Sequence, residues 1–396
     1  MVHTHNSKMT VLGVLPVDWE VSNIQDCFQK NENIKIGPFG SQLKKEYLLP
    51  RGDYYVYGQE NVYQDDFHIC YRFLSFQRFN SLKSCEIRPG DFVVSTMGTI
   101  GKCAVVPDYA HTGIMDSHLV RMRFNDSINK SFFAYLFRSR VIQDQIRKLS
   151  VGGIMEGLST SILKKINVIL PPIQEQKRIA GALLSVDKMI GALDKAIAKK
   201  RQIKEGLMQQ LLTGKTRLPG FKGEWTTVSL GSISQMYQPQ TITQDSLTIS
   251  GYPVYGANGI IGKYPYYNHI TDQVMVTCRG SSCGTVNYSV GYCWITGNAM
   301  VVNMDGYHVN KRFIYYVLDR ADLTSLITGS GQPQIVRTPL QRLEIFIPKS
   351  VEEQTAIAES LDSIERDIIS IESKRKKYSL IKQGMMQELL TGKTRL

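Results

Sequence analysis

The sequence lacks the features that mark membrane and secreted proteins. No stretch approaches the roughly 18 consecutive apolar residues of a membrane span, and the polar segment from Met1 to Thr10 has no apolar run of the signal-peptide kind. The cysteines are scattered and include no C-x-x-C pair, which argues against a disulfide framework and a zinc site. They are Cys27, Cys70, Cys85, Cys103, Cys278, Cys283 and Cys293. We therefore expect a protein of the reducing cytoplasm.

Catalytic motifs are also missing. Gly-Lys-Thr at residues 214–216 and 392–394 looks like the end of a phosphate-binding loop, but Gln209 and Gln387 stand where that loop needs glycine. The tetrapeptide that holds the target amine in adenine methyltransferases is absent, as is any nuclease constellation. The seven histidines form no metalloprotease pattern. We expect no active site, no metal site and no bound cofactor in this chain.

What is present is a folded, basic protein. The 396 residues are 42% apolar and 21% charged, which fits two ordinary domains with connecting helices. Lys and Arg outnumber Asp and Glu by 47 to 35, for a net charge of +12. Such a charge favours a polyanionic partner, above all nucleic acid. A membrane surface, or solubility alone, would also account for it.

The chain contains an internal repeat. Residues 206–218 read GLMQQLLTGKTRL and residues 384–396 read GMMQELLTGKTRL, and the upstream Glu175-Gln176 recurs as Glu353-Gln354, 178 positions later. Between these segments the apolar positions are spaced 4, 3, 4, 3, as in a heptad seam. They are Ile179, Leu183, Val186, Ile190 and Leu193, repeated as Ile357, Leu361, Ile364, Ile368 and Ile371.

Each repeated segment predicts one long helix. Pro171-Pro172 and Pro348 precede the helices, and Gly214 and Gly392 follow them, where a helix end favours glycine. About 40 residues would span about 60 Å, more than a globular domain needs. An apolar seam needs a partner, so we expect the two helices to pack on each other as an antiparallel pair with internal pseudo-two-fold symmetry. The alternative is that each helix packs only on its own domain. The seam is interrupted near Lys199 to Arg201, where ideal pairing is in doubt.

The regions before the helices, here called head 1 (residues 1–168) and head 2 (residues 219–346), repeat more loosely. Each opens with Leu-Pro ahead of a tryptophan, contains a strand ending in a glycine turn near residues 98 and 280, and closes with an alternating strand. Head 1 is roughly 25 residues longer, because the openings lie 203 positions apart and the ends 178. Helices that stay alike while heads diverge suggest identical partners for the helices and different targets for the heads. Unequal drift after an old duplication would give the same pattern.

Both heads interleave aromatic, basic and amide residues. Arg and Lys donate to guanine, Asn and Gln bridge adenine, and basic or hydroxyl groups hold phosphates. The candidate DNA contacts are Lys44, Lys45, Tyr57, Gln59, Asn61, Thr99, Lys102 and Arg121 in head 1, and Tyr255, Asn258, Lys263, Tyr264, Arg279, Gln332, Gln334 and Arg337 in head 2. Taken singly, a tyrosine is more often half-buried and a surface lysine more often just solvated.

Several of these segments resemble the specificity subunits of type I restriction-modification systems, over nearly the whole chain. The resemblance rests on the doubled Leu-Leu-Thr-Gly-Lys, on Leu170-Pro171-Pro172 with Glu175-Gln176, and on three glycine-containing segments of the heads. These are Gly37-Pro38-Phe39-Gly40-Ser41, the run from Ser95 to Lys102, and the run from Gly329 to Ile335.

This resemblance implies an α+β chain with two mixed α/β target recognition domains (1–168 and 219–346). They are separated by a central (169–218) and a C-terminal (347–396) conserved helical region. Each recognition domain would read half of a split DNA sequence through the major groove. The helices would dock two adenine methyltransferase subunits, and two nuclease and translocase subunits would join. S-adenosylmethionine, ATP and magnesium would be bound by those partners.

Within the helices, the residues nearest each start are the predicted methyltransferase-docking positions. They are Glu175, Gln176, Ile179 and Leu183, with Glu353, Gln354, Ile357 and Leu361 in the second copy. Two other classes of function remain to be compared. A methyltransferase would need a cofactor-binding motif, and a scaffold of paired helices would leave two divergent, basic heads unexplained.

Overall fold

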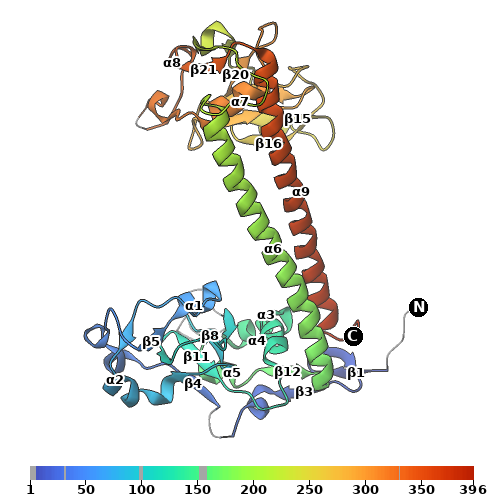
Figure 1. Cartoon of the computed structure of the whole chain (residues 1–396). Helices are drawn as coiled ribbons and strands as arrows, with labels where there is room; N and C mark the ends of the chain where they lie inside the picture. Colours follow the sequence, from blue (N-terminus) through green and yellow to red (C-terminus); the bar gives the residue numbers. More distant parts are fainter. Residues whose placement is uncertain (1–5, 31–32, 98–100, 151–157, 330) are drawn as a thin grey trace. The chain divides into compact units, whose positions relative to one another are not determined.

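The structure is a computed structural model that describes residues 6–30, 33–97, 101–150, 158–329 and 331–396. It divides into two compact units (Figure 1). Unit 1 comprises residues 1–192 and 375–396, and unit 2 comprises residues 193–374. Both boundaries fall inside long helices, so each unit holds one head, the start of one helix and the end of the other. The division between heads and helices at residues 168, 218 and 346 stays a prediction.

The two predicted long helices are present. They are α6 (Ile173–Leu211) and α9 (Val351–Leu389), of 39 residues each. Both stop where the chain turns through a glycine with φ of 69°, at Gly214 and Gly392, a backbone conformation that favours glycine over other residues. The proline and glycine signals therefore located both ends of each helix.

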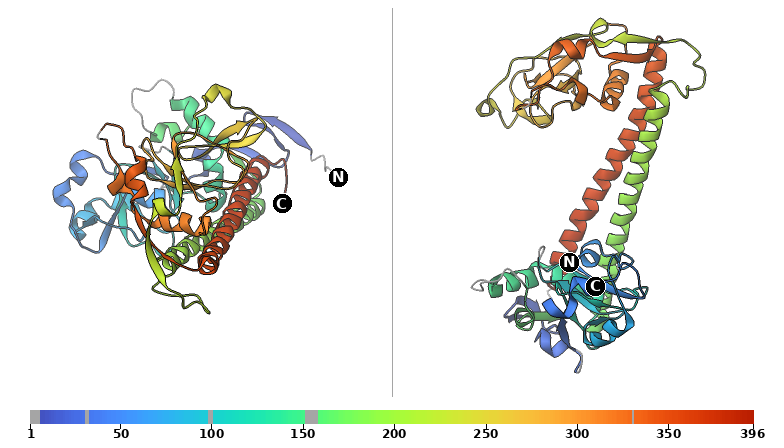
Figure 2. Two further views of the ribbon diagram at one scale, coloured as in Figure 1. Left: turned by 90° about the horizontal axis from the view of Figure 1, so that it is seen from above. Right: turned by 90° about the vertical axis from the view of Figure 1, so that its left-hand side faces the viewer.

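The helices pack side by side and antiparallel (Figure 2). In unit 2, Lys200 pairs with Asp367 at 2.6 Å and Lys204 with Glu365 at 2.5 Å, so the numbering rises along α6 while it falls along α9. In unit 1, Lys382 pairs with Asp187 at 2.6 Å. The antiparallel pair is thus confirmed. Where the seam is interrupted, ion pairs to Lys200 and Arg201 replace apolar contacts in unit 2.

Head 1 is a mixed α/β body. Its antiparallel sheet β4-β11-β8-β9 lies beside the mixed sheet β6-β5-β10-β7, and β12 pairs with β3 next to the start of α6. The strands are β1 (Ser7–Thr10), β2 (Gly13–Pro16), β3 (Glu20–Asn23), β4 (Ile34–Ile36), β5 (Tyr54–Tyr57), β6 (Phe73–Leu74), β7 (Glu86–Ile87), β8 (Phe92–Ser95), β9 (Cys103–Val105), β10 (Gly113–Met115), β11 (Leu119–Met122) and β12 (Asn167–Leu170). The helices are α1 (Gln59–Gln64), α2 (Phe76–Ser81), α3 (Lys130–Arg138), α4 (Arg140–Ser150) and α5 (Thr160–Leu163).

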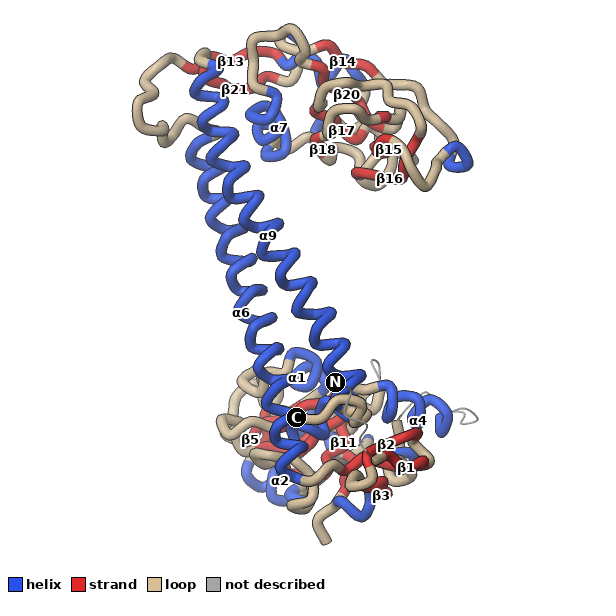
Figure 3. The backbone as a smooth tube through the Cα atoms, turned by 90° about the vertical axis from the view of Figure 1, so that its right-hand side faces the viewer, coloured by secondary structure: helices blue, strands red, loops and turns tan. Residues whose placement is uncertain are grey.

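Head 2 repeats this plan in shorter form (Figure 3). The sheet β14-β20-β17-β18 corresponds to β4-β11-β8-β9, β16-β15-β19 to the mixed sheet, and β13-β21 to the β3-β12 pair. The strands are β13 (Trp225–Ser229), β14 (Gln235–Tyr237), β15 (Tyr252–Gly256), β16 (Gly259–Tyr264), β17 (Val274–Thr277), β18 (Val286–Tyr288), β19 (Trp294–Ile295), β20 (Ala299–Asn303) and β21 (Glu344–Pro348), with helices α7 (Lys311–Arg320) and α8 (Arg337–Gln341).

The larger apolar core of each unit joins a head to both helices. In unit 1 the core takes Ile179 and Leu183 from the start of α6 and Leu389 from the end of α9. In unit 2 it takes Met208 and Leu211 from the end of α6, and Ile357 and Leu361 from the start of α9. The helices therefore pack both on each other and on the heads, which combines the two arrangements considered from the sequence.

In each unit, an arginine that follows one long helix forms an ion pair with a glutamate at the start of the other, at equivalent positions of the repeat. Arg395 donates to both carboxylate oxygens of Glu175, at 2.7 and 2.6 Å, and Arg217 donates to both of Glu353, at 2.5 Å each. Hydrogen bonds from Arg395 to Glu175, and then to Asp18, raise the pKa of its guanidinium. The end of one helix segment is thus tied to the start of the other in both units.

The neighbouring glutamines anchor the heads. Gln176 accepts from the backbone N–H of Asn129 at 2.8 Å, and Gln354 accepts from that of Asn310 at 2.8 Å. Each glutamine also donates, at 2.9 Å, to the carbonyl of the proline that precedes its helix.

These contacts correct the predicted docking residues. Each of the eight residues is at most 1% exposed, so a partner protein cannot touch them while the units are folded. The apolar members lie in the cores, and the polar members bind segments of the same chain. The residues concerned are Glu175, Gln176, Ile179, Leu183, Glu353, Gln354, Ile357 and Leu361.

Candidate nucleic-acid interface

In head 2, the glycine turn that follows β17 lies against the loop that precedes α8. The Ile335 N–H donates to the Cys278 carbonyl at 3.1 Å, and the Gly280 N–H donates to the Pro333 carbonyl at 3.2 Å. Arg279 and Gln334 form an antiparallel bridge between the two segments. Two motifs more than 50 residues apart therefore form one surface, as their local glycine and proline content allows.

A cleft of about 390 Å³ opens at this junction. Three of the predicted DNA contacts, Arg279, Gln334 and Arg337, line it and are exposed. Gln238 lines it as well and was missed by the sequence analysis, although it lies in a Gln-Pro-Gln segment directly after a strand. Its amide donates to the Cys278 sulfur at 2.8 Å and to the Gly297 carbonyl at 3.3 Å.

The chemistry of this cleft suits base edges. Two guanidinium groups and two amides converge, and these side chains make bidentate contacts with guanine and adenine in the major groove. Among the residues that the structure describes, no carboxylate forms an ion pair with Arg279 or Arg337, so neither positive charge is neutralised internally. The cleft can therefore present both donors and acceptors to a ligand.

The other head 2 candidates surround this region less closely. Gln332 is exposed in the same loop, and Asn258 is exposed in the turn between β15 and β16. That turn is held to the end of β17 by a hydrogen bond from the Thr277 hydroxyl to the Ala257 carbonyl. Lys263 is exposed on β16, while the Tyr264 ring packs edge-on against Trp294, with centroids 5.0 Å apart.

Head 1 has the corresponding junction. The Leu158 N–H donates to the Thr96 carbonyl at 2.9 Å, matching the bond from Ile335 to Cys278. The Gln59 amide donates to the Met97 carbonyl at 2.8 Å and holds the start of the turn, and Lys102 is exposed at its end. Thr99, also predicted to contact DNA, lies outside the described residues.

Lys44 lies between two short 3-10 turns, η2 (Gly40–Leu43) and η3 (Lys45–Tyr47), and Lys45 begins the second; both lysines are exposed. Lys44 makes only a loose ion pair with Glu46, at 3.5 Å. The preceding Gly37 is required by packing, because a Cβ there would lie 1.7 Å from the Asp116 carbonyl oxygen.

Four predicted contacts are corrected by the structure, because their side chains are buried and bonded within the fold. The Tyr57 hydroxyl donates to the His111 carbonyl at 2.8 Å, and burial raises the pKa of Tyr57. The Asn61 amide donates to the carbonyls of Asp66 and Ile69. Arg121 donates to the Glu86 carbonyl at 2.5 Å, and the Tyr255 hydroxyl accepts from the Val290 N–H at 3.1 Å.

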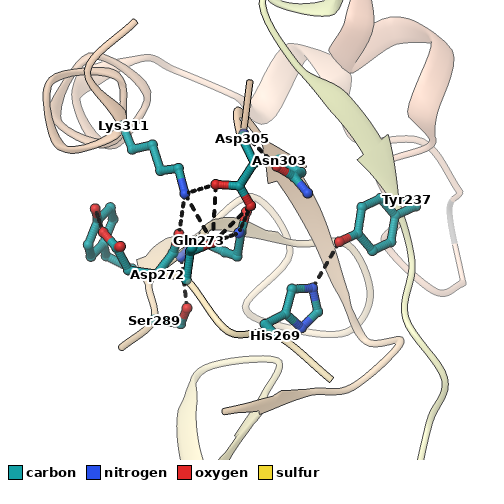
Figure 4. A network of polar contacts seen from close by, with 10 residues as sticks. Tyr237, His269, Asp272, Gln273, Ser289, Asn303, Asp305 and Lys311 are labelled. Atoms are coloured by element: carbon teal, nitrogen blue, oxygen red, sulfur yellow. Dashed lines mark hydrogen bonds and ion pairs between the residues drawn. The ribbon is translucent and has the colours of Figure 1, made fainter. Parts of the chain in front are cut away.

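Head 2 also contains two groups of bonded polar side chains, one around Asp305 and one around His269 (Figure 4). Asp305 accepts from Lys311, from Thr271 at 2.8 Å and from Gln273 at 2.9 Å. The His269 ring lies 3.0 Å from the Tyr237 hydroxyl, and burial lowers the pKa of His269. Because these side chains bond within head 2, we assign both groups to its stability.

In the described part of the chain, no group of three or more His, Cys, Asp or Glu side chains is arranged to hold a metal ion. None of the described helices is both long and apolar enough to cross a bilayer.

Comparison with known proteins agrees with this architecture. Residues 16–205 and 222–380 match the model of the type I restriction modification DNA specificity domain. The chain is 24% identical to the type I restriction enzyme EcoprrI specificity subunit of Escherichia coli, covering 84% of this chain and 85% of that one. It is 25% identical to the MjaVIII specificity subunit of Methanocaldococcus jannaschii, covering 72% of this chain and 75% of that one.

A solved structure shares the fold. The type I restriction-modification S subunit from M. genitalium superposes with a TM-score of 0.66 at 16% identity, over 94% of this chain and 96% of that one. Since the family model matches both heads and most of both long helices, this chain belongs to the family of type I restriction-modification specificity subunits.

Proposed function

We propose that the two heads read two separate segments of one DNA duplex, which gives a bipartite, asymmetric target. The observation that carries the proposal is the paired junction of glycine turn and loop. The backbone bond from Ile335 to Cys278 in head 2 recurs as that from Leu158 to Thr96 in head 1, while the side chains that the junction presents differ. Head 2 offers Arg279, Gln334 and Arg337, whereas head 1 offers Gln59 and Lys102. A shared backbone arrangement that presents different side chains in the two heads suits recognition of two different half-sites.

The net charge of +12 supports binding to a polyanion. Contacts to phosphates release counterions, so binding should weaken steeply as salt rises. The side chains of the cleft would supply base readout, and exposed lysines such as Lys44, Lys45 and Lys263 would hold the backbone.

The helices are the proposed docking surface for two adenine methyltransferase subunits, with two nuclease and translocase subunits completing the complex. S-adenosylmethionine would bind the methyltransferase, and ATP and magnesium the nuclease. Exposed apolar side chains on both helices support docking, since water does not favour such exposure. They are Leu184, Met189, Ile203, Ile369, Leu380 and Ile381, each 40–60% exposed.

Mapping of methylated adenines tests this proposal. The chain is expressed with the methyltransferase and nuclease genes beside its own, in a host without other methylation, and the genome is sequenced with modification detection. We expect one bipartite motif that disappears when the gene for this chain is deleted. A continuous motif, or methylation that persists after the deletion, would contradict the proposal.

A further inference from the structure

Each unit has a groove where a helical segment of the head meets the second half of a long helix. In unit 1 it lies between the α3–α4 junction and α9, with a volume of about 660 Å³. In unit 2 it lies between the end of α7, α6 and a stretch of α9, with a volume of about 550 Å³.

The repeat shows that these are one groove occurring twice. Six lining positions are equivalent, at an offset of 181 residues in the heads and 178 in the helices. Arg138 corresponds to Asp319, Ser139 to Arg320, Ser379 to Arg201, Lys382 to Lys204, Gln383 to Glu205, and Met386 to Met208. Two copies of one partner would therefore meet equivalent surfaces.

The charges of the two grooves differ. The groove of unit 1 is lined by four cationic residues and no carboxylate, whereas that of unit 2 is lined by three cationic residues and four carboxylates. Four of the six equivalent positions change charge. Arg138 is replaced by Asp319 and Gln383 by Glu205, which makes unit 2 more acidic, whereas Ser139 is replaced by Arg320 and Ser379 by Arg201, which adds two cations there. Identical partners therefore meet opposite local fields.

In unit 2 the cations are largely neutralised within the groove. Arg201 pairs with Glu372 at 2.6 Å and Lys204 with Glu365 at 2.5 Å. Burial, together with the nearby carboxylates of Glu365 and Glu205, raises the pKa of Asp319. This groove has little net attraction for an acidic segment.

In unit 1 the cations are more available. Lys382 is paired with Asp187, and Arg138 donates to the Cys103 carbonyl at 2.6 Å. Among the described residues, no carboxylate pairs with Arg140 or Lys393, and both are exposed. Between these charges the groove is lined by Val141, Met386 and Leu390. An apolar floor with a cationic rim fits an acidic amphipathic helix better than it fits a DNA backbone, which has no apolar ridge to fill the floor.

We propose that the groove of unit 1 is the tighter docking site for an acidic, amphipathic segment of the methyltransferase subunit, and that the groove of unit 2 binds the second copy more weakly. This rests on the proposed function, since it names the partner. The two copies then load in order, unit 1 first. Loading at unit 1 depends on salt, because complementary charges there are exposed to the solvent.

The test is a titration of the purified methyltransferase subunit into the full chain, followed by native mass spectrometry at low and high ionic strength. We expect two separated steps, and the tighter step should weaken more as salt rises. Hydrogen exchange at half saturation should show protection in residues 379–393 before residues 201–208.

Exchanging equivalent residues supplies matched variants. Arg138→Asp with Gln383→Glu gives unit 1 the two acidic residues of unit 2 at these positions, and we expect the first step to weaken by about tenfold or more. Asp319→Arg with Glu205→Gln makes the reverse change, and should bring the second step toward the first. Because Arg138 has an internal hydrogen bond, Arg140→Glu with Lys393→Glu provides a second unit 1 variant that disturbs no contact described above.

The outcomes separate this inference from the proposed function. Two equal steps that none of the variants changes would overturn the inference and leave the proposed function standing. Protection appearing first in unit 2 would overturn it as well. If no complex with the methyltransferase forms and no bipartite methylation is found, both fail.

Discussion

Glu175 and Glu353 are carboxylates with almost no solvent exposure, and each has its charge balanced by one arginine from the far end of a repeat. Truncating one partner of a buried pair costs more than the pair itself contributes, because the remaining charge has lost water without compensation. Glu175 keeps only a hydrogen bond from the Trp19 indole, at 3.0 Å, if Arg395 is removed. Substituting one partner of either pair therefore measures how much that ion pair stabilises its unit.

Arg395→Ala should destabilise unit 1 by about 3 kcal/mol. Hydrogen exchange measured by mass spectrometry should show faster exchange at the start of α6 and in β3 and β12, with unit 2 unchanged. Lys349→Ala is the control, because its partner Glu224 is exposed and such pairs contribute little. If the two substitutions lowered stability equally, the ion pair of Arg395 would contribute no more than an exposed pair does.

Head 2 should lose stability in mild acid. Burial lowers the pKa of His269 below its ordinary value of 6.5, and the nearby Lys311 lowers it further, while Asp305 opposes them. The unfolded chain therefore binds a proton on this histidine at a higher pH than the folded chain does. Stability is present above about pH 6.5 and falls as the pH drops toward the folded pKa. Amide hydrogen-exchange rates of head 2 at pH 7.5 and 5.5, corrected for the intrinsic rates, measure this loss of stability. In the variant His269→Gln, the corrected rates at the two pH values should differ less.

Arg337→Ala should relax the sequence read by head 2 alone. Loss of a bidentate contact to a base costs about 1–3 kcal/mol of discrimination at that position. Methylated-adenine mapping should show one degenerate position in one half-site and an unchanged second half-site. Lys263→Ala, which we assign to phosphate contact, should instead lower occupancy evenly across sites. A change in both half-sites on mutating Arg337 would count against the assignment.

Residue types alone could not distinguish exposed side chains that can contact bases from buried side chains of the same type that stabilise the fold. Tyr57, Asn61 and Arg121 have the same chemistry as true contacts, and only burial and their carbonyl partners exclude them. Arg279 and Gln334 were recognisable as candidates, but their meeting depends on a backbone bridge across 55 positions that no local pattern encodes. Gln238 was missed because it lies far in sequence from both motifs.

Among the elements, the helices were the most predictable. Heptad spacing, proline before the start and glycine after the end are local signals, and they gave α6 and α9 nearly to the residue. The sheets were not predictable in this way. Strand β5 pairs with β10 in parallel, and β15 with β19, through connections whose partners are set by packing of the whole head. The burial of the first turns of α6 and α9 against the heads was not predicted either, because it also depends on packing of the whole head.

The helix pair should act as a ruler for the unread spacer of the target. Inserting one turn of four residues after Ala192, with a matching insertion after Lys374, adds about 6 Å to both helices. We expect the spacer in the methylated motif to lengthen by one or two base pairs, at about 3.4 Å each. Insertion in α6 alone is the control, since it shifts the ion pairs of unit 2 out of register and should reduce assembly. A spacer that stays unchanged after the double insertion would refute the ruler.

On the scale of the whole molecule, recognition is modular. Replacing residues 20–168 by those of another specificity subunit should change one half-site of the methylated motif and leave the other intact. The exchange keeps Glu175, so its ion pair with Arg395 can still form. It also keeps Gln176, and the replacement must therefore provide a residue equivalent to Asn129, whose backbone N–H binds that glutamine. Simultaneous change of both half-sites would show that the heads do not read independently.

Closure of unit 1 by Arg395 also sets an order for events on the ribosome. Unit 2 is a single continuous segment, residues 193–374, and can complete its core as soon as that segment has emerged. Head 1 is synthesised first, yet its core lacks Leu389 and Leu390, and Glu175 lacks its arginine, until residues 375–396 are made. The first part of the protein to be translated is therefore the last to be finished, and a message cut short before these residues yields a chain whose leading half stays open to proteases.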